Sequence, residues 1–158
     1  METIEKWRAV CAALLGLLTG LWGWMGWLVL GWTGAMILDY VTGSAAAAKQ
    51  GLWSSAKARE GIWHKAGMIV VVIVAAGADL LIALVLERLP GAGFPFEYGS
   101  LICPVVLVWY VLSELGSIIE NAVDMGAPVP VWLTRLLLVS RQAIDRAGEE
   151  LTEGGEDE

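Results

Sequence analysis

An almost unbroken apolar run near the start of the chain is the feature that most constrains its fold. The run extends from Ala9 to Leu38 without a charged residue, and after Asp39 the apolar pattern continues to Ala48. A straight helix over 9–48 would be about 60 Å long, whereas the hydrocarbon core of a bilayer is about 30 Å thick. The segment therefore predicts two membrane helices joined by a turn, or one long tilted span.

The composition of the whole chain also indicates a membrane protein. Of its 158 residues, 57% are hydrophobic and 17% are charged, whereas a soluble domain is about 25% charged. A globule of this size could not hide so much apolar surface from water. The net charge of −7 comes mostly from residues 145–158, which hold seven acids and one base. Because no basic patch exists, we expect no nucleic-acid partner.

Glycine and tryptophan indicate where the first segment turns. Gly20, Gly23 and Gly26 lie among three tryptophans. Glycine permits a tight reversal of the backbone, and tryptophan prefers the membrane interface. We therefore predict a turn over 23–26, and a single span that ends near Leu38 is the alternative.

A polar stretch over 49–65 follows, with four basic residues and one acid besides His64. Such an excess of Lys and Arg predicts a cytoplasmic loop by the positive-inside rule. Ser54 or Ser55 is suited to cap a short interfacial helix over 56–64. Counting spans from this loop, we expect the C-terminus in the cytoplasm.

The predicted fold is an all-α integral membrane helical bundle with three or four transmembrane helices plus a C-terminal amphipathic helix. Residues 1–147 form the predicted membrane domain, and 148–158 form an acidic tail that we expect to be disordered. The residue pattern over 131–147 predicts an interfacial helix on the inner membrane surface. The apolar helices are expected over about 8–22, 27–48, 66–86 and 99–119.

Three carboxylates fall within or near the predicted spans: Asp39, Asp79 and Glu114. A charge at the centre of a bilayer costs about 2.5–3.5 kcal/mol on insertion scales. Because the spans contain no Lys or Arg, we expect Asp39 and Asp79, near the middle of the membrane, to lack a basic partner there. They either face a wet interior within an assembly or stay neutral and fix helix contacts with hydroxyls such as those of Tyr40 and Thr42.

Small residues on the first two predicted helices indicate close helix packing. Glycine lets two helix backbones approach each other in lipid, where packing replaces the hydrophobic driving force. Contacts between copies and contacts within one bundle would both use such residues. The candidates are Gly16, Gly20, Gly31 and Gly34.

The sequence contains no recognisable catalytic or metal-binding motif. His64 is the only histidine, and the two cysteines, Cys11 and Cys103, lie in apolar runs. Metal sites and nucleophilic catalysis need several such side chains at defined spacings. We therefore predict no enzyme activity, no metal site and no cofactor.

Four short motifs follow one another between residues 27 and 140. D-Y-x-T-G lies at 39–43, G-x-x-S-S at 51–55, S-I-x-E-N at 117–121 and G-x-P-x-P at 126–130. In this order they resemble the bacteriophage holin family of the toxin-secretion/phage-lysis type. The resemblance adds pore or helix-contact candidates to the three carboxylates, namely Tyr40, Thr42, Gly43, Ser117, Glu120 and Asn121.

The resemblance implies a non-enzymatic, multi-pass protein of the bacterial inner membrane whose partners are the lipid bilayer and other copies of itself. Such proteins open lesions that release an endolysin, their functional partner, or a toxin, and the host cell lyses. Two features depart from the family pattern: Ser113 stands where asparagine is common, and the tail is acidic where many members end in basic residues. The alternatives are a small proton-linked membrane transporter and a membrane adaptor whose acidic tail recruits a soluble protein.

Overall fold

The computed structural model describes residues 4–9, 12–13, 16, 20, 23–88 and 100–153. Over these residues the chain is helical without strands, as predicted. The predicted helix over 8–22 lies largely outside the described residues. The helices with defined bounds are α2 (Trp24–Lys49), α3 (Ser55–Arg88), α4 (Ile102–Asp124) and α5 (Val131–Glu153).

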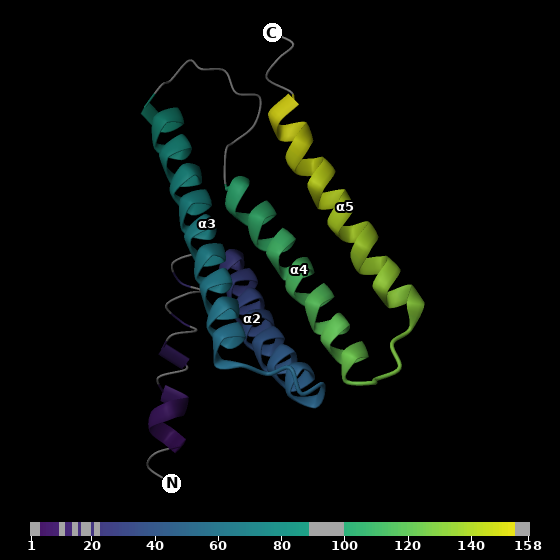
Figure 1. Ribbon diagram of the computed structural model, residues 1–158. Helices are drawn as coiled ribbons and strands as arrows, with labels where there is room; N and C mark the ends of the chain where they lie inside the picture. The colour runs from purple at the N-terminus through teal and green to yellow at the C-terminus, as the bar shows by residue number, and fades with distance from the viewer. Residues whose placement is uncertain are drawn as a thin grey trace.

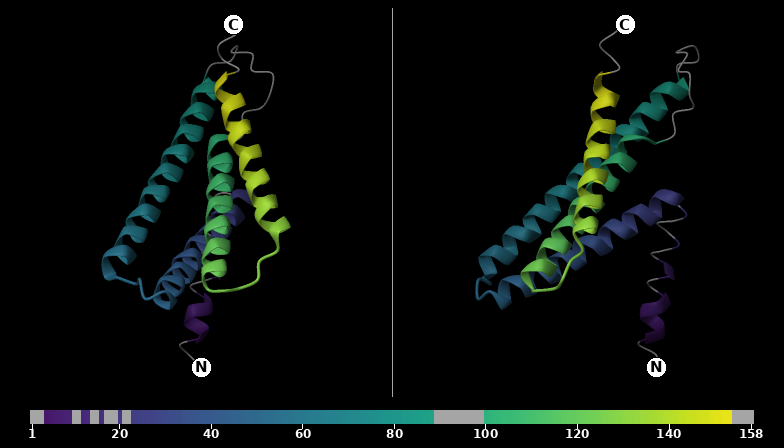
Figure 2. Two further views of the ribbon diagram at one scale, coloured as in Figure 1. Left: turned by 45° about the vertical axis from the view of Figure 1, so that its right-hand side comes forward. Right: turned by 90° about the vertical axis from the view of Figure 1, so that its right-hand side faces the viewer.

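Helix α4 is the centre of the arrangement. It packs against α2 and α3 to form a three-helix bundle, and α5 folds back along its other side (Figures 1 and 2). Residues 50–54 join α2 to α3, and residues 125–130 join α4 to α5 at the same end of the molecule (Figure 1). We call this the turn end.

Helix α2 begins three residues earlier than the predicted 27–48. Gly23 is its N-cap and adopts a φ of 52°, a backbone conformation that favours glycine. The amide of Gly26 already donates to the carbonyl of Gly23 over 3.2 Å. The turn predicted over 23–26 is thus confined to Gly23, because the next three residues are helical.

Helix α3 is a single helix of 34 residues. The sequence predicted a loop and a short helix before a separate span at 66–86. Ser54 does act as the predicted cap, since its Oγ accepts the Lys57 amide at 3.2 Å. No proline interrupts the segment from there to Arg88, so the short helix and the span join.

The last two helices also differ from their predicted bounds. Helix α4 begins at Ile102, three residues after the predicted start at 99, and continues to Asp124 instead of ending at 119. Helix α5 continues past 147, so residues 148–153 are helical and not part of a disordered tail as predicted. Residues 154–158 lie outside the described part of the chain.

Helices α3 and α4 are long and apolar enough to cross a membrane. Only 17% of the most apolar eighteen-residue stretch of α3, and 22% of that of α4, is buried inside the bundle. This outward apolar surface needs an apolar solvent. The further spans predicted at 8–22 and 27–48 stay predictions. The buried core is small and consists of Met25, Trp32, Met36, Met68, Val72, Ala75, Cys103 and Leu107.

Candidate functional site

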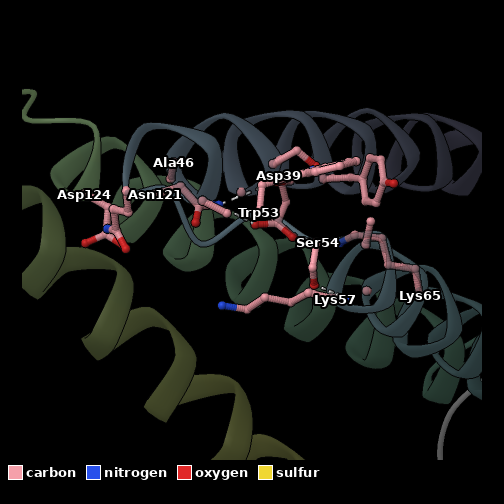
Figure 3. A pocket seen from close by; sticks show the side chains of 15 residues that line it. Asp39, Ala46, Trp53, Ser54, Lys57, Lys65, Asn121 and Asp124 are labelled. Atoms are coloured by element: carbon pink, nitrogen blue, oxygen red, sulfur yellow. Dashed lines mark hydrogen bonds and ion pairs between the residues drawn. The ribbon is translucent and has the colours of Figure 1, made fainter.

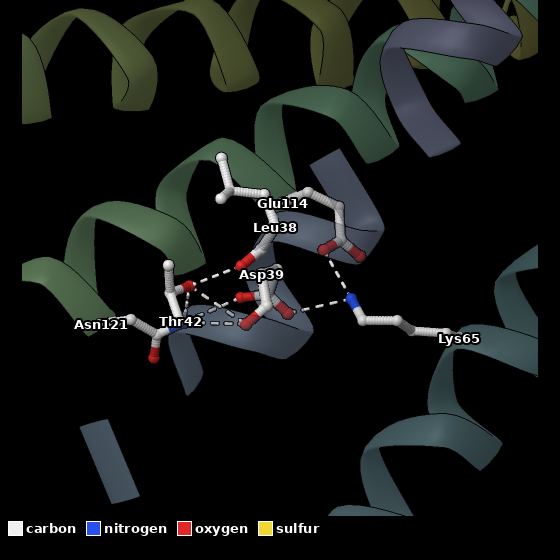
Figure 4. Close-up of polar contacts among 6 residues, drawn as sticks. All are labelled: Leu38, Asp39, Thr42, Lys65, Glu114 and Asn121. Carbon is white, nitrogen blue, oxygen red and sulfur yellow. Dashed lines mark hydrogen bonds and ion pairs between the residues drawn. The ribbon is translucent and has the colours of Figure 1, made fainter. Parts of the chain in front are cut away.

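Three charged side chains, one from each helix of the bundle, meet inside it. Lys65 Nζ lies 2.9 Å from Asp39 Oδ2 and 2.6 Å from Glu114 Oε2 (Figure 4). All three side chains are largely buried, and Glu114 most of all, with 4% of its side chain exposed. We call this group the ion layer. The prediction that Asp39 lacks a basic partner is therefore wrong.

The ion layer depends on a common register of the three helices. Asp39 lies ten residues before the end of α2, Lys65 ten residues after the start of α3, and Glu114 ten residues before the end of α4. At 1.5 Å per residue the layer is about 15 Å from the turn end. Sequence reasoning missed Lys65 because it placed this residue in a loop. The signal available was that no proline lies between Ser55 and the span predicted from residue 66.

Asn121 extends the ion layer toward the turn end. Its Nδ2 donates to Asp39 Oδ1 at 3.0 Å and to Thr42 Oγ1 at 3.1 Å (Figure 4). The Asn121 amide also lies against Gly43, where an added Cβ would come within 3.4 Å of it. The D-Y-x-T-G motif of α2 and the final asparagine of the S-I-x-E-N motif of α4 are thus direct neighbours.

The remaining motif residues have other positions. The Tyr40 ring lies beside Gly61 of α3, about 3.9 Å from where a Cβ would be, so it packs α2 against α3. Ser117 lines the same cavity as Asp39. Glu120 is exposed and does not enter the ion layer. The structure therefore brings most of the predicted candidates together and leaves Glu120 outside.

Asp79 caps the beginning of α4 from α3. Its carboxylate accepts the backbone amides of Leu101, Ile102 and Cys103 at 3.2, 3.0 and 2.8 Å, and the Ser100 hydroxyl at 2.9 Å. The first amides of a helix have no partner within the helix, and the helix dipole favours a negative charge there. We call this group the cap layer. It lies fourteen residues beyond Lys65, which is about 21 Å along α3.

The cap layer supplies acceptors for backbone amides that α4 cannot satisfy by itself. Helix α3 continues nine residues beyond Asp79 to Arg88, so α4 begins well below the far end of α3. The free amides at the start of α4 lie against α3, where a buried acceptor can satisfy them in place of water. Asp79 is only 5% exposed, and its contacts favour the interpretation that it fixes helix contacts.

A third contact joins α2 to α4 at the turn end. Lys49 Nζ donates a hydrogen bond to the carbonyl of Met125, directly after the last residue of α4. Gly126 follows with a φ of 88°, a conformation that favours glycine. A cation at the C-terminus of a helix complements the helix dipole.

Two cavities border the ion layer. One of about 270 Å³ opens at the turn end, where Asp39, Lys57, Lys65 and Asp124 line it (Figure 3). The other, of about 640 Å³, is lined mainly by α3 and α4, with Asp39 of α2 and Arg141 of α5, and so by the whole ion layer. Both include charged side chains in their lining and are large enough for water. The described residues include no group of three His, Cys, Asp or Glu side chains placed to hold a metal ion.

One aromatic residue of α4 holds α5. The guanidinium carbon of Arg141 lies 4.6 Å from the centre of the Trp109 ring, and Trp109 Nε1 donates to Asp145 Oδ1 at 2.5 Å. Arg141 and Asp145 are one turn apart, so they share a face of α5. This docking was not predicted, because the sequence suggested a helix that lies flat on the membrane surface.

The glycines expected at helix contacts lie away from the bundle interior. A Cβ added at any of them would meet no heavy atom within 4 Å among the described residues. Among the described residues no neighbouring helix packs closely on these positions, whereas Gly43 and Gly61 are close to a neighbouring helix. The outward glycines are Gly16, Gly20, Gly31 and Gly34.

Helices α3 and α4 expose most of their apolar side chains. The ion layer and the cap layer join the helices on the inside. This arrangement is that of a helical membrane protein. A model of the bacteriophage holin family matches residues 16–141. The chain belongs to the bacteriophage holin family.

A relative shares the sequence over most of its length. An uncharacterized protein of Halalkalibacterium halodurans is 33% identical over 140 residues, which cover 88% of this chain and 95% of the relative. No solved structure matches the chain.

Proposed function

We propose that the chain is a phage-type holin that oligomerises in the bacterial inner membrane and forms lesions through which an endolysin or a toxin passes. The family match over residues 16–141 carries this proposal, since it includes the ion layer and the cap layer. The family is non-enzymatic in general, and we propose no catalytic activity or cofactor for this member.

The outward surface of the bundle supports self-association. Gly31 and Gly34 lie on the exposed side of α2 and leave room for a second helix. Small residues of this kind allow close approach of helices in lipid. The prediction that copies associate through them is therefore better supported than packing within one chain.

The ion layer supports a role in opening a wet path. Asp39 and Glu114 share one lysine, so the layer holds one formal negative charge in excess. An unbalanced charge in a membrane needs water or a polar group beside it, and the cavity of about 640 Å³ provides this space. When copies assemble, the layer is the place where water first reaches the bundle interior.

Expression with and without an endolysin in a bacterium tests the proposal. With both proteins we expect a sudden fall in culture turbidity and in membrane potential, and with the chain alone we expect the fall in potential without breakdown of the cell wall. Glu114→Gln should change the time of onset, because it alters the ion layer. Glu60→Gln is the control, since Glu60 is exposed on α3 outside the layer.

Three outcomes contradict this function. Intact cells in the presence of the endolysin would exclude lesions large enough for an enzyme. Proton movement in liposomes without loss of a large dye would indicate a proton-linked transporter. Complete loss of function on deletion of residues 154–158, which follow α5, would indicate an adaptor, because a holin should only change its timing.

A further inference from the structure

A groove runs between α2 and α3 from the turn end into the apolar part of the bundle. The two helices diverge as they leave the turn end (Figure 2), and they touch each other much less than either touches α4. Two cavities occupy the space between them, one of about 270 Å³ at the turn end and one of about 330 Å³ farther along. Tyr40 and Lys65 line both cavities, so the two are adjoining halves of one groove.

The residues that line the groove follow one stripe along each helix. Side chains three and four residues apart share a face of a helix, and the lining positions keep this spacing from one half of the groove into the other. The stripe of α2 includes Thr33, Ile37, Tyr40 and Ser44. The stripe of α3 includes Lys57, Gly61, Lys65 and Ile69.

The groove changes from polar to apolar near Lys65. Helix α3 is long and apolar enough to cross a membrane, and its apolar run extends over Ala66–Leu86 with a single charge. The half of the groove beyond Lys65 is lined mostly by apolar side chains such as Ile37 and Ile69. The half toward the turn end is polar and includes Trp53, a residue type that prefers the membrane interface. The polar half therefore lies at the level of lipid headgroups and the apolar half at the level of acyl chains.

Two charges of opposite sign in the polar half have no partner in the bundle. Asp39 and Lys65 also line this half, but they pair with each other. Lys57 Nζ and the Asp124 carboxylate make no ion pair or hydrogen bond within the described part of the chain. Figure 3 shows the Lys57 side chain extending from α3 toward the side of the cavity where α4 carries Asp124.

This pair of charges is complementary to a ligand that carries a phosphate and an ammonium group. A lysine ammonium donates charge-assisted hydrogen bonds to phosphate oxygens, and a carboxylate accepts them from a primary ammonium. A purely anionic ligand would satisfy Lys57 and be repelled by Asp124. The apolar half of the groove favours a hydrocarbon tail on the same ligand, because apolar surface there is removed from water.

We propose that the groove between α2 and α3 binds one phospholipid with a phosphoethanolamine headgroup. Lys57 binds the phosphate, and Asp124 accepts a hydrogen bond from the ammonium group. One acyl chain lies along the apolar half, past Ile37 and Ile69, and the lipid belongs to the leaflet at the turn end. The site is complete in a single chain, so it does not depend on the formation of a lesion.

A photoreactive lipid tests the site in membranes. The probe is a phosphatidylethanolamine with a diazirine in one acyl chain, present as a small fraction of phosphatidylcholine vesicles that contain the full chain. After irradiation, peptide mass spectrometry should find adducts at Ile37 and Ile69 in excess over Val74, which is exposed on α3 outside the groove. With the probe fraction held constant, unlabelled phosphatidylethanolamine in place of phosphatidylcholine should lower the adducts in the groove, whereas phosphatidylglycerol should not.

Single changes of charge test the headgroup contacts. Lys57→Gln should lower the labelling of the groove about tenfold, because a charge-assisted hydrogen bond is lost. Arg59→Gln is the matched control, since Arg59 carries the same charge two residues away, is exposed and does not line the groove. Asp124→Asn should remove the preference for phosphatidylethanolamine over phosphatidylglycerol, and Glu120→Gln should keep it. All four side chains are exposed, so circular dichroism should show the parent's helix content in every variant.

Three results overturn the inference. Equal labelling of the groove and of Val74 would mean that lipid only surrounds the bundle. Unchanged labelling in Lys57→Gln would mean that no headgroup is bound at the turn end. A groove without adducts would mean that another protein segment covers it. A chain that binds the lipid but releases no endolysin would keep the site and reject the holin function instead.

Discussion

The two polar layers of the bundle stabilise buried carboxylates in different ways. In the ion layer, Asp39 and Glu114 depend on another side chain, Lys65. In the cap layer, Asp79 depends on the backbone of α4. Mutation can replace a charged side chain and its ion-pair partner at the same time. The backbone amides at the start of a helix cannot be removed in this way. The ion layer is thus adjustable by mutation, and the cap layer is a fixed requirement of a helix whose first amides lie against another helix.

The largest effect should come from Lys65→Met, which leaves two buried carboxylates facing each other. Removal of one partner from a buried ion pair costs about 3–5 kcal/mol. We expect a loss of that size in the free energy of unfolding, measured by denaturation in detergent micelles with circular dichroism. The triple variant Lys65→Met, Asp39→Asn, Glu114→Gln should recover most of the loss. A triple variant no more stable than the single one would show that the layer is not replaceable.

Asp79→Ala should come next and should have no rescue. An unsatisfied buried amide costs about 1–3 kcal/mol, and this change frees the three amides that begin α4, so we expect a loss of about 3 kcal/mol. Asp79→Asn should lose less, because its amide oxygen still accepts. The same denaturation experiment measures both variants. A loss below about 1 kcal/mol for Asp79→Ala would mean that the cap is not needed.

Asn121→Ala should have a smaller effect. It removes hydrogen bonds to Asp39 and Thr42 but leaves the ion pairs in place, so we expect a loss of about 1–2 kcal/mol. Glu120→Ala is the neighbouring control and should stay within about 0.5 kcal/mol of the parent, because Glu120 is exposed. Equal losses for the two variants would contradict the position of Asn121 inside the layer.

Trp109→Phe should have the smallest effect on the bundle. The change removes the indole donor to Asp145 but keeps an aromatic ring beneath Arg141, so the expected loss is about 0.5–1 kcal/mol. Val106 of α4 and Ile144 of α5 line one cavity, so cysteines placed at these two positions should be cross-linked less readily in the variant, while the unfolding of α2, α3 and α4 hardly changes. A large fall in stability would show that α5 is part of the bundle core.

Local patterns predicted most of the helices, because apolar length and turn residues act within one segment. The D-Y-x-T-G and S-I-x-E-N motifs also named Asp39 and Asn121, which the structure brings into contact. The predicted helix boundaries were less accurate where a polar stretch of sequence was interpreted as a loop between helices. The stretch around Lys65 is polar, but nothing in it prevents helix, and α3 continues through it.

The roles that were missed depend on contacts between segments far apart in the chain. Lys65 reaches Glu114 only because two helices share a register, and no local pattern records that register. The Asp79 cap likewise requires α4 to begin beside the last third of α3. The docking of α5 was missed because an amphipathic pattern is compatible with lipid and with a neighbouring helix alike.

The stretch of α2 between Asp39 and Lys49 is attached at both ends. Asp39 binds Lys65 and Asn121, while Lys49 reaches the end of α4, and four alanines, Ala45–Ala48, lie between them. One inserted residue would rotate one attachment by about 100° and shift it by about 1.5 Å relative to the other. Evolution can therefore exchange small residues along this stretch, but insertions and deletions there should be rare among descendants of this chain.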